Sequence, residues 1–332
     1  MGTSRTYSTM LRAVLGALVV VALFSFFDMK GCVTALSDVT AWDLVIIFGL
    51  SIALVLVSVL KWGLFLERLG IIASVPHLFR LYLVGYFVNL IMPSALGGDV
   101  VRSLYVGKDV DRVRAMSATL LERYTGFIAM VSMAFVAVWC APAVSWEITV
   151  ATIVLGVSAL GLTVALLTGT LVRVSELFGV PSKLHGKLLR MQEGFSWGLS
   201  DRRLVARAGL LSLAFHLLTI VNTAAVAYAV GWEEVPWGDL FVVVPLILLI
   251  GAIPLSPQGL GIQEGAFLYF LHAVGATTGQ ALAVALVLRA KSYVLALCGG
   301  GLWLTLSRDS SLRKVEEGSK VHDAIEPEYP VV

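Results

Sequence analysis

Two interruptions in otherwise apolar segments hold most of the residue types that can bind a charged group. The first, MPSALGGDVVR, contains Pro93, Gly97, Gly98, Asp99 and Arg102. The second, IPLSPQGLGIQEG, contains Pro254, Gly259, Gly261 and Glu264. Proline removes a backbone donor and favours a break, whereas glycine permits a sharp turn with close backbone approach.

Broken helices of this kind attract anions, because a break leaves backbone N–H groups at the start of the next helix without partners. The helix dipole adds to this attraction. Two breaks that meet inside the protein are therefore predicted to build one polar site. The alternative is that each break is an ordinary kink in a packed helix.

An arginine follows each interruption at nearly the same distance. Arg123 lies 24 positions after Asp99, and Arg289 lies 25 positions after Glu264. We expect Glu264 to pair with Arg289. Asp99 and Arg102 are three residues apart, so on a helix they share one face and can pair.

Glu122 precedes Arg123 directly, so these two side chains are expected to find different partners. One interpretation of all these charges is mutual neutralisation that holds the two halves of the chain together. The other is bidentate binding of a phosphate headgroup by the arginines.

The composition is that of a membrane protein. Of 332 residues, 58% are hydrophobic and 14% charged, with a mean hydropathy of +0.90, against roughly 25% charged in soluble domains. Apolar runs near twenty residues long predict an all-α polytopic membrane protein. Full spans are expected at about 13–27, 44–60, 115–140, 148–168, 208–230 and 280–306, and broken segments at about 78–106 and 240–273.

The distribution of Lys and Arg predicts the topology, because cytoplasmic loops are enriched in both. Basic residues flank the first broken segment on both sides, whereas GWEEVPWGD and HAVGATTGQ flank the second. The first hairpin is thus expected to open to the cytoplasm and the second to the outside, each being re-entrant or crossing twice. The result is an inverted-topology repeat, as in many transporters.

We therefore expect one transmembrane domain over residues 1–308, with repeat one at about 10–140 and repeat two at about 148–308. Residues 309–332 are polar and predict a disordered cytoplasmic tail. Both termini are expected in the cytoplasm, and the protein in the cell (inner) membrane.

Other polar residues of the apolar segments have weaker signals. His216, Thr219 and Thr223 share one helical face near Asn222 and either line a polar path or satisfy one another across helices. Lys291 follows Arg289 by two residues, so it is expected to point away from it. Cys32, Cys140 and Cys298 are too few and too scattered for a disulfide framework or a metal site. We expect no metal and no cofactor.

The segments GYFVNLIMPSALGGDVVRSLYV, LLERYTGF and IPLSPQGLGIQEGAF resemble the membrane region of the lysylphosphatidylglycerol synthetase/flippase family. The resemblance covers about residues 10–308. The matching residues are Asn89, Pro93, Gly97, Gly98, Asp99, Arg102, Glu122, Arg123, Pro254, Gly259, Gly261, Glu264, Gly265 and Arg289. It implies a flippase in which a headgroup crosses through a polar path. Because the sequence ends soon after the last expected span, aminoacyl transfer is not carried over.

The expected function is transport of a phospholipid or lipid-linked headgroup by a protein that is not an enzyme. The residues expected to bind or move the substrate are Asn89, Pro93, Gly97, Gly98, Asp99, Arg102, Glu122, Arg123, Pro254, Gly259, Gly261, Glu264 and Arg289. The alternatives are an intramembrane lipid-modifying enzyme, although HExxH and GxSxG are absent from the sequence, and a non-catalytic partner of a lipid-synthesis enzyme. We expect membrane lipids with a phosphate headgroup as partners and no nucleic acid; homo-oligomerisation and the identity of the lipid stay open.

Overall fold

The computed structural model describes residues 29–92, 97–107, 112–141, 144–170, 173, 201–253 and 256–307. All regular elements in these ranges are helices. The first half contains α2 (Met29–Ser37), α3 (Ala41–Arg68), α4 (Val75–Ile91), α5 (Gly97–Val106), α6 (Arg112–Ala137) and the short 3-10 helix η1 (Val138–Cys140). The second half contains α7 (Trp146–Leu167), α10 (Arg202–Ala229), α11 (Trp237–Ala252), the 3-10 helix η2 (Pro257–Gly259), α12 (Ile262–Ala273) and α13 (Thr278–Ser307).

The prediction of a polytopic all-α membrane protein is confirmed. Within the described ranges, five helices are long and apolar enough to cross a bilayer: Ala41–Arg68, Arg114–Cys140, Trp146–Ala165, Arg202–Ala229 and Thr278–Thr305. They coincide with five of the six expected spans. The expected span at 13–27 and the tail at 309–332 lie outside the described residues.

Local signals explain where the long helices begin. Thr40 and Asp43 form a reciprocal capping box at the start of α3. Asp201 caps α10, where its carboxylate accepts hydrogen bonds from the backbone N–H groups of Leu204 and Arg203. These bonds lower the pKa of Asp201 below its usual value, because they stabilise the ionised form.

Both expected breaks are present. In the first half α4 ends at Ile91 and α5 begins at Gly97; in the second, α11 ends at Ala252 and α12 begins at Ile262. Pro93 and Pro254 themselves lie outside the described residues.

Glycine lets the backbones of each hairpin approach closely. A Cβ atom on Gly98 would lie 2.0 Å from the Gly85 carbonyl oxygen, and one on Gly259 would lie 2.6 Å from that of Gly251. Each break is therefore folded back against the helix that precedes it.

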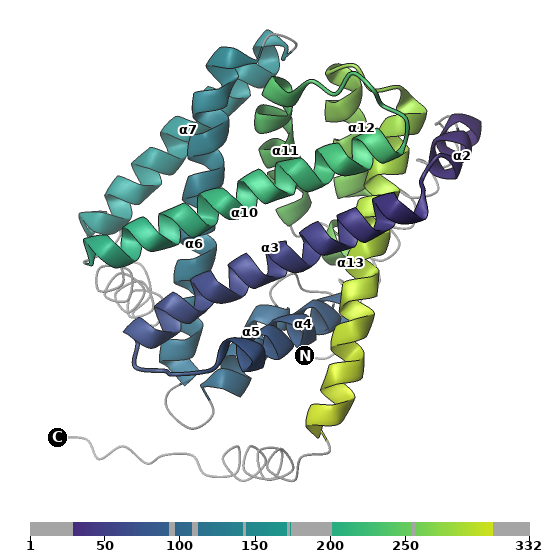
Figure 1. The fold of residues 1–332 in the computed structure, drawn as a ribbon. Coiled ribbons are helices and arrows are strands. Elements are labelled where there is room, and N and C mark those ends of the chain that lie inside the picture. Colours follow the sequence, from purple (N-terminus) through teal and green to yellow (C-terminus); the bar gives the residue numbers. More distant parts are fainter. Residues whose placement is uncertain are drawn as a thin grey trace, which may run out of the picture.

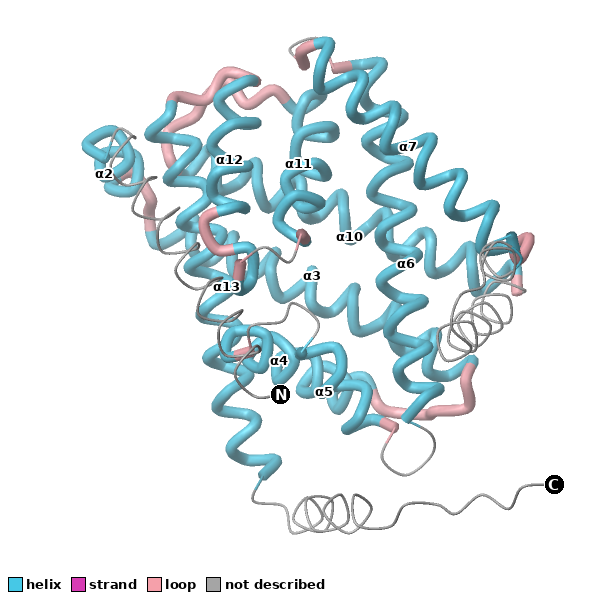
Figure 2. The backbone as a smooth tube through the Cα atoms, turned by 180° about the vertical axis from the view of Figure 1, so that it is seen from behind, coloured by secondary structure: helices cyan, strands magenta, loops and turns pink. Residues whose placement is uncertain are grey.

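The long helices α3 and α10 lie side by side and run in opposite directions (Figure 1). Asn222, near the end of α10, bonds Ile47 near the start of α3, while Ser212 bonds Lys61 nearer the end of α3. Helices α3 and α10 cross the middle of the molecule. Helices α4 and α5 lie on one side of this pair, and α11 and α12 lie on the other (Figure 2).

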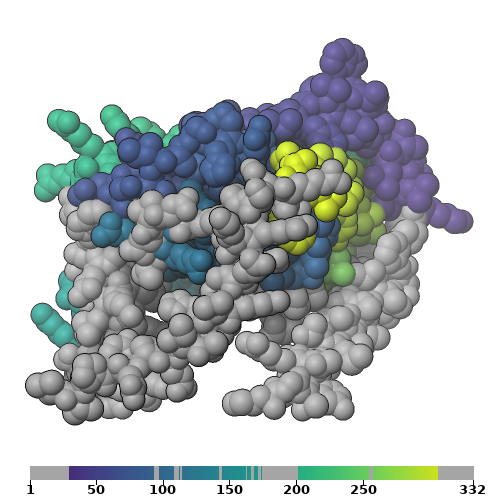
Figure 3. All heavy atoms as spheres, turned by 90° about the horizontal axis from the view of Figure 1, so that it is seen from below, coloured from purple at the N-terminus to yellow at the C-terminus, as the bar shows by residue number. Residues whose placement is uncertain are grey.

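The two halves make matching contacts. Helix α4 packs against α13 of the second half, and α11 packs against α6 of the first half; within the halves, α5 packs against α6 and α12 against α13. Seen from below, the last turns of α13 emerge beside the blue residues of the first half (Figure 3). Each helix of the first hairpin thus has a counterpart with matching contacts in the second, as expected for an inverted repeat, which stays a prediction.

Candidate functional site

Four charged residues of the first half form one group of ion pairs, here called the first-half cluster: Asp99, Arg102, Glu122 and Arg123. Arg102 lies 3.0 Å from Asp99 and 2.6 Å from Glu122, while Arg123 lies 2.7 Å from Asp99. The expected pairing of Asp99 with Arg102 is confirmed. Glu122 and Arg123 have different partners, as their adjacency predicts.

Aromatic rings complete the surroundings of Arg102. Its guanidinium carbon lies 4.6 Å from the Trp62 ring centroid and 4.3 Å from that of Tyr82, distances at which cation–π attraction operates. Tyr82 also donates a hydrogen bond of 3.2 Å to Glu122. Arg102 is only 2% exposed. Its charge is thus balanced by two carboxylates and covered by two rings, an arrangement suited to holding helices together.

Arg123 differs from the other members of this cluster. Its side chain is 53% exposed, although its guanidinium contacts the buried carboxylate of Asp99. Asp99 therefore connects the buried Arg102 to a cation at the edge of the cluster.

At the start of α5, side chains of the same protein contact the backbone of Gly97 and Gly98. The side-chain oxygen of Asn89 on α4 accepts a hydrogen bond of 2.6 Å from the Gly98 N–H. A Cβ atom on Gly97 would lie 2.6 Å from the Met92 sulfur. Gly97, Gly98 and Asn89 thus close the first hairpin, and the Gly98 N–H already has an acceptor.

The second-half cluster consists of Glu264 and Arg289, and their expected pairing is confirmed. Arg289 donates through Nε to Glu264, through Nη1 to the Gln258 carbonyl at 3.0 Å and through Nη2 to the Gly259 carbonyl at 3.5 Å. Glu264 also accepts a hydrogen bond of 2.7 Å from the Gly261 N–H. One arginine from α13 therefore holds the break between α11 and α12 in place.

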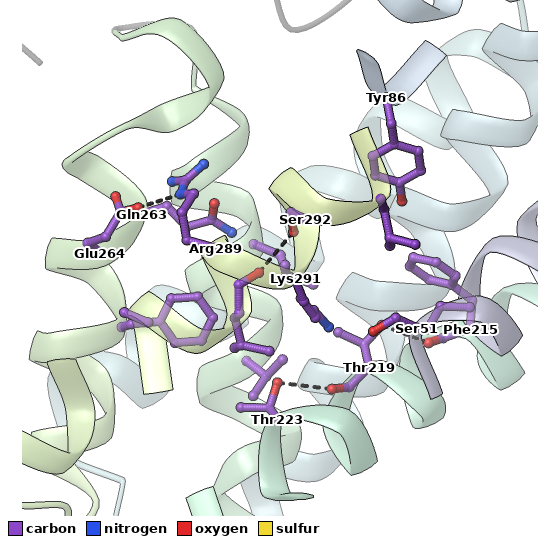
Figure 4. Close-up of a pocket in the computed structure, with 17 residues that line it drawn as sticks. Ser51, Tyr86, Phe215, Thr219, Thr223, Gln263, Glu264, Arg289, Lys291 and Ser292 are labelled. Carbon is purple, nitrogen blue, oxygen red and sulfur yellow. Dashed lines mark hydrogen bonds and ion pairs between the residues drawn. The ribbon is translucent and has the colours of Figure 1, made fainter. Parts of the chain in front are cut away.

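A cavity of about 160 Å³ lies between the two halves (Figure 4). Its walls come from α3, α4, α10, α11, α12 and α13. Apolar side chains such as Leu54 and Phe267 form part of it. The polar residues that line it are Ser51, Tyr86, Thr219, Thr223, Gln263, Glu264, Arg289, Lys291 and Ser292.

Lys291 lies in this cavity but was not among the predicted site residues. As expected, it points away from Arg289: Arg289 reaches Glu264, whereas Lys291 extends toward Ser51 and Thr219 (Figure 4). Its ammonium donates a hydrogen bond of 2.6 Å to the Asn222 side-chain oxygen. The sequence does show a lysine in the middle of an apolar span, which could have marked Lys291 as a site residue. Its spacing from Arg289 does not reveal that it lines a cavity.

The structure divides the predicted site residues between two places. Glu264 and Arg289 line the cavity, while the first-half cluster is absent from the lining. Thr219 and Thr223 line it as well, whereas His216 bonds the Gly126 carbonyl at 2.9 Å on α6. In the described ranges no group of three or more His, Cys, Asp or Glu residues could hold a metal ion.

Comparison with known proteins gives a family match over residues 9–300, to the family described as lysylphosphatidylglycerol synthase TM region. The chain is 24% identical over 319 residues to a UPF0104 membrane protein of Methanothermobacter thermautotrophicus, covering 86% of this chain and 90% of that protein. It is 21% identical over 283 residues to UPF0104 membrane protein PH1989 of Pyrococcus horikoshii, covering 76% and 84%. A shorter match, 34% identical over 128 residues, is to glycosyltransferase AglD of Haloferax volcanii, covering 37% of this chain and 20% of that protein.

Proposed function

Since this chain belongs to the lysylphosphatidylglycerol synthase transmembrane-region family, we propose that it is a lipid transporter. It moves a phospholipid or lipid-linked headgroup across the bilayer through the cavity between its halves. The membrane is the cell membrane, with both termini in the cytoplasm.

The observation that carries this proposal is a cavity with charged side chains in its wall. Charged groups inside apolar spans are costly and are usually found at functional sites. Here an arginine and a lysine face a cavity whose walls combine helices of both halves. Transporters built from inverted repeats bind their substrates at such an interface.

The two charge clusters have positioning roles in this proposal. Arg289 and Glu264 hold the second break beside the cavity, and the first-half cluster holds α5 against α6. Asn89, Gly97, Gly98, Gly259 and Gly261 shape the two hairpins, as do Pro93 and Pro254. A headgroup that passes through the cavity then meets preformed walls.

Reconstitution into liposomes tests the proposal. Fluorescent phosphatidylglycerol or phosphatidylethanolamine is included in trace amounts, and access of a membrane-impermeant quencher to each is followed with time. We expect quenching beyond the half reached in protein-free vesicles, and slower quenching with Arg289→Gln. The exposed charge of Glu67 provides the control variant Glu67→Gln, which is expected to match the wild type.

The same vesicles distinguish the alternatives. Extraction and mass spectrometry of the lipids would show a new product if the protein were a lipid-modifying enzyme. Quenching no faster than in protein-free vesicles, for every lipid tried, would contradict the transport proposal and favour the enzyme or the partner role.

A further inference from the structure

The cavity contains one carboxylate and two cations, and only one of the cations has a carboxylate partner. Glu264 is paired with Arg289. Lys291 has no carboxylate within ion-pair distance in the described part of the chain, and its hydrogen bond goes to the neutral amide of Asn222. The described lining therefore has a surplus of one positive charge.

Arg289 uses three of its five N–H donors on Glu264 and on the carbonyls of Gln258 and Gly259, and Glu264 balances its charge. An ammonium carries three N–H donors, and Lys291 uses one of them on Asn222. Asn222 in turn donates to the Ile47 carbonyl at 3.0 Å and to Ser51 at 3.3 Å. Lys291 is thus held in position, with two donors remaining.

Three hydroxyl groups of the lining donate to backbone carbonyls and can accept from a ligand. Thr219 donates to the Phe215 carbonyl, Thr223 to the Thr219 carbonyl and Ser292 to the Leu288 carbonyl. Each hydroxyl has a single proton, so its lone pairs remain for donors of a ligand. The hydroxyl groups of a glycerol or a sugar are such donors.

The size of the cavity limits what it takes. Sites for drug-sized ligands measure roughly 300–1,000 Å³, whereas this cavity measures about 160 Å³. It therefore accommodates a headgroup without its acyl chains.

On the premise of the proposed function, we infer that the cavity selects a phosphate-bearing headgroup of net negative charge with hydroxyl substituents, and that Lys291 binds its phosphate. Phosphoglycerol has this chemistry, and so does a sugar phosphate. A headgroup with an added ammonium is disfavoured, because the surplus charge of the cavity repels it and a buried cation needs a partner.

Two lipids of similar headgroup size test the inference. Transport of fluorescent phosphatidylglycerol, with net charge −1, is compared with that of zwitterionic phosphatidylethanolamine in the liposome assay. We expect the wild type to prefer phosphatidylglycerol by about tenfold, because both lipids offer a phosphate to Lys291 but the ammonium of phosphatidylethanolamine is repelled by the surplus positive charge. Lys291→Met should lose this preference, and Lys291→Arg should keep most of it.

Lys61 provides the matched control. It is a buried lysine that contacts Ser212 and the Phe215 ring and is not part of the cavity lining. Lys61→Met is expected to keep the lipid preference. Lys291→Gln serves as the second uncharged variant if Lys291→Met does not fold, and each variant is checked by thermal melting.

The outcomes separate this inference from the transport proposal. If the wild type transports both lipids at equal rates, the inferred charge selection is overturned and the transport proposal is not. If neither lipid crosses, the transport proposal fails. Binding of soluble headgroup compounds then tests whether Lys291 forms a phosphate site.

In that case the melting temperature is measured with glycerol 3-phosphate, phosphoethanolamine and inorganic phosphate. Stabilisation by glycerol 3-phosphate that is lost in Lys291→Met would support the inferred site. No stabilisation, or equal stabilisation by inorganic phosphate, would overturn the assignment to a headgroup.

Discussion

Arg102 is the residue whose charge is most completely enclosed in the first half. Its partners are two carboxylates and two aromatic rings. Without it Asp99 still contacts Arg123, but among the described residues Glu122 keeps only the hydroxyl of Tyr82. The consequence of removing Arg102 is therefore a buried carboxylate without a cation.

We predict that Arg102→Met lowers the free energy of unfolding by about 3–5 kcal/mol, the usual cost of breaking a buried ion pair from one side. Equilibrium unfolding in mixed detergent micelles measures it. The double variant Arg102→Met/Glu122→Gln removes both charges and should recover part of the loss. A single variant as stable as the wild type would show that the pair does not hold the helices.

The sequence predicts some of these contacts and not others. The i, i+3 spacing gives the Asp99–Arg102 pair, and the matched offsets of 24 and 25 residues anticipate the Glu264–Arg289 pair. That Lys291 lies in a cavity depends on helices far apart in the chain, and no local spacing contains that information.

At the scale of helices, close backbone contact replaces hydrophobic driving force, as is usual in membranes. Helix α13 shows this at two positions. A Cβ atom on Gly279 would lie 2.6 Å from the Gly31 carbonyl carbon of α2, and one on Gly299 would lie 1.9 Å from the Leu83 carbonyl oxygen of α4. The packing of α13 on the first half thus depends on the absence of side chains there.

Gly299 and Gly301 give a matched pair of variants on one helix. Gly299→Ala forces α13 away from α4, and we expect it to lower the free energy of unfolding by about 1–3 kcal/mol or more. A Cβ atom on Gly301 meets nothing within 4 Å, so Gly301→Ala is expected to be neutral or to stabilise by up to about 1 kcal/mol. Thermal melting in detergent measures both, and equal effects would contradict this view of the interface.

The positions of the breaks were predictable, but their packing was not. Proline and glycine at MPSALGGD and IPLSPQGLGIQEG mark where α4 and α11 end. Nothing in the sequence indicated that Asn89 and Glu264 would accept the N–H bonds that each break exposes. Side chains from the chain itself compete with a ligand for such donors, and only the folded geometry shows which one occupies them.

At the scale of the whole molecule, the exposed tryptophans of the described helices lie at the opposite helix ends from a set of arginines. Trp42, Trp139, Trp146 and Trp237 are exposed, and they lie at the start of α3, after α6 and at the starts of α7 and α11. The opposite ends of α3 and α6 and the start of α10 carry Arg68, Arg112, Arg114, Arg202, Arg203 and Arg207. Tryptophan belts lie at membrane interfaces, and basic residues favour the cytoplasmic side.

Thiol labelling tests this orientation. With Cys32 and Cys298 replaced by alanine, the exposed Cys140 after α6 is expected to react with a membrane-impermeant maleimide in intact cells. Glu67→Cys at the end of α3, in the same background with Cys140→Ala, should react only after permeabilisation. The reverse pattern would invert the topology and contradict cytoplasmic termini.

Gln258 is the only non-glycine residue with a positive φ in the described ranges, at 51°. The left-handed conformation costs about 1–2 kcal/mol for a residue with a side chain, and here Arg289 bonds the Gln258 carbonyl. The second break therefore contains a backbone conformation that costs free energy, and the hydrogen bond from Arg289 helps to hold it. Loss of Arg289 would remove one contact that holds this strained turn, while the Gly261–Glu264 hydrogen bond and the close approach of Gly259 to Gly251 would remain.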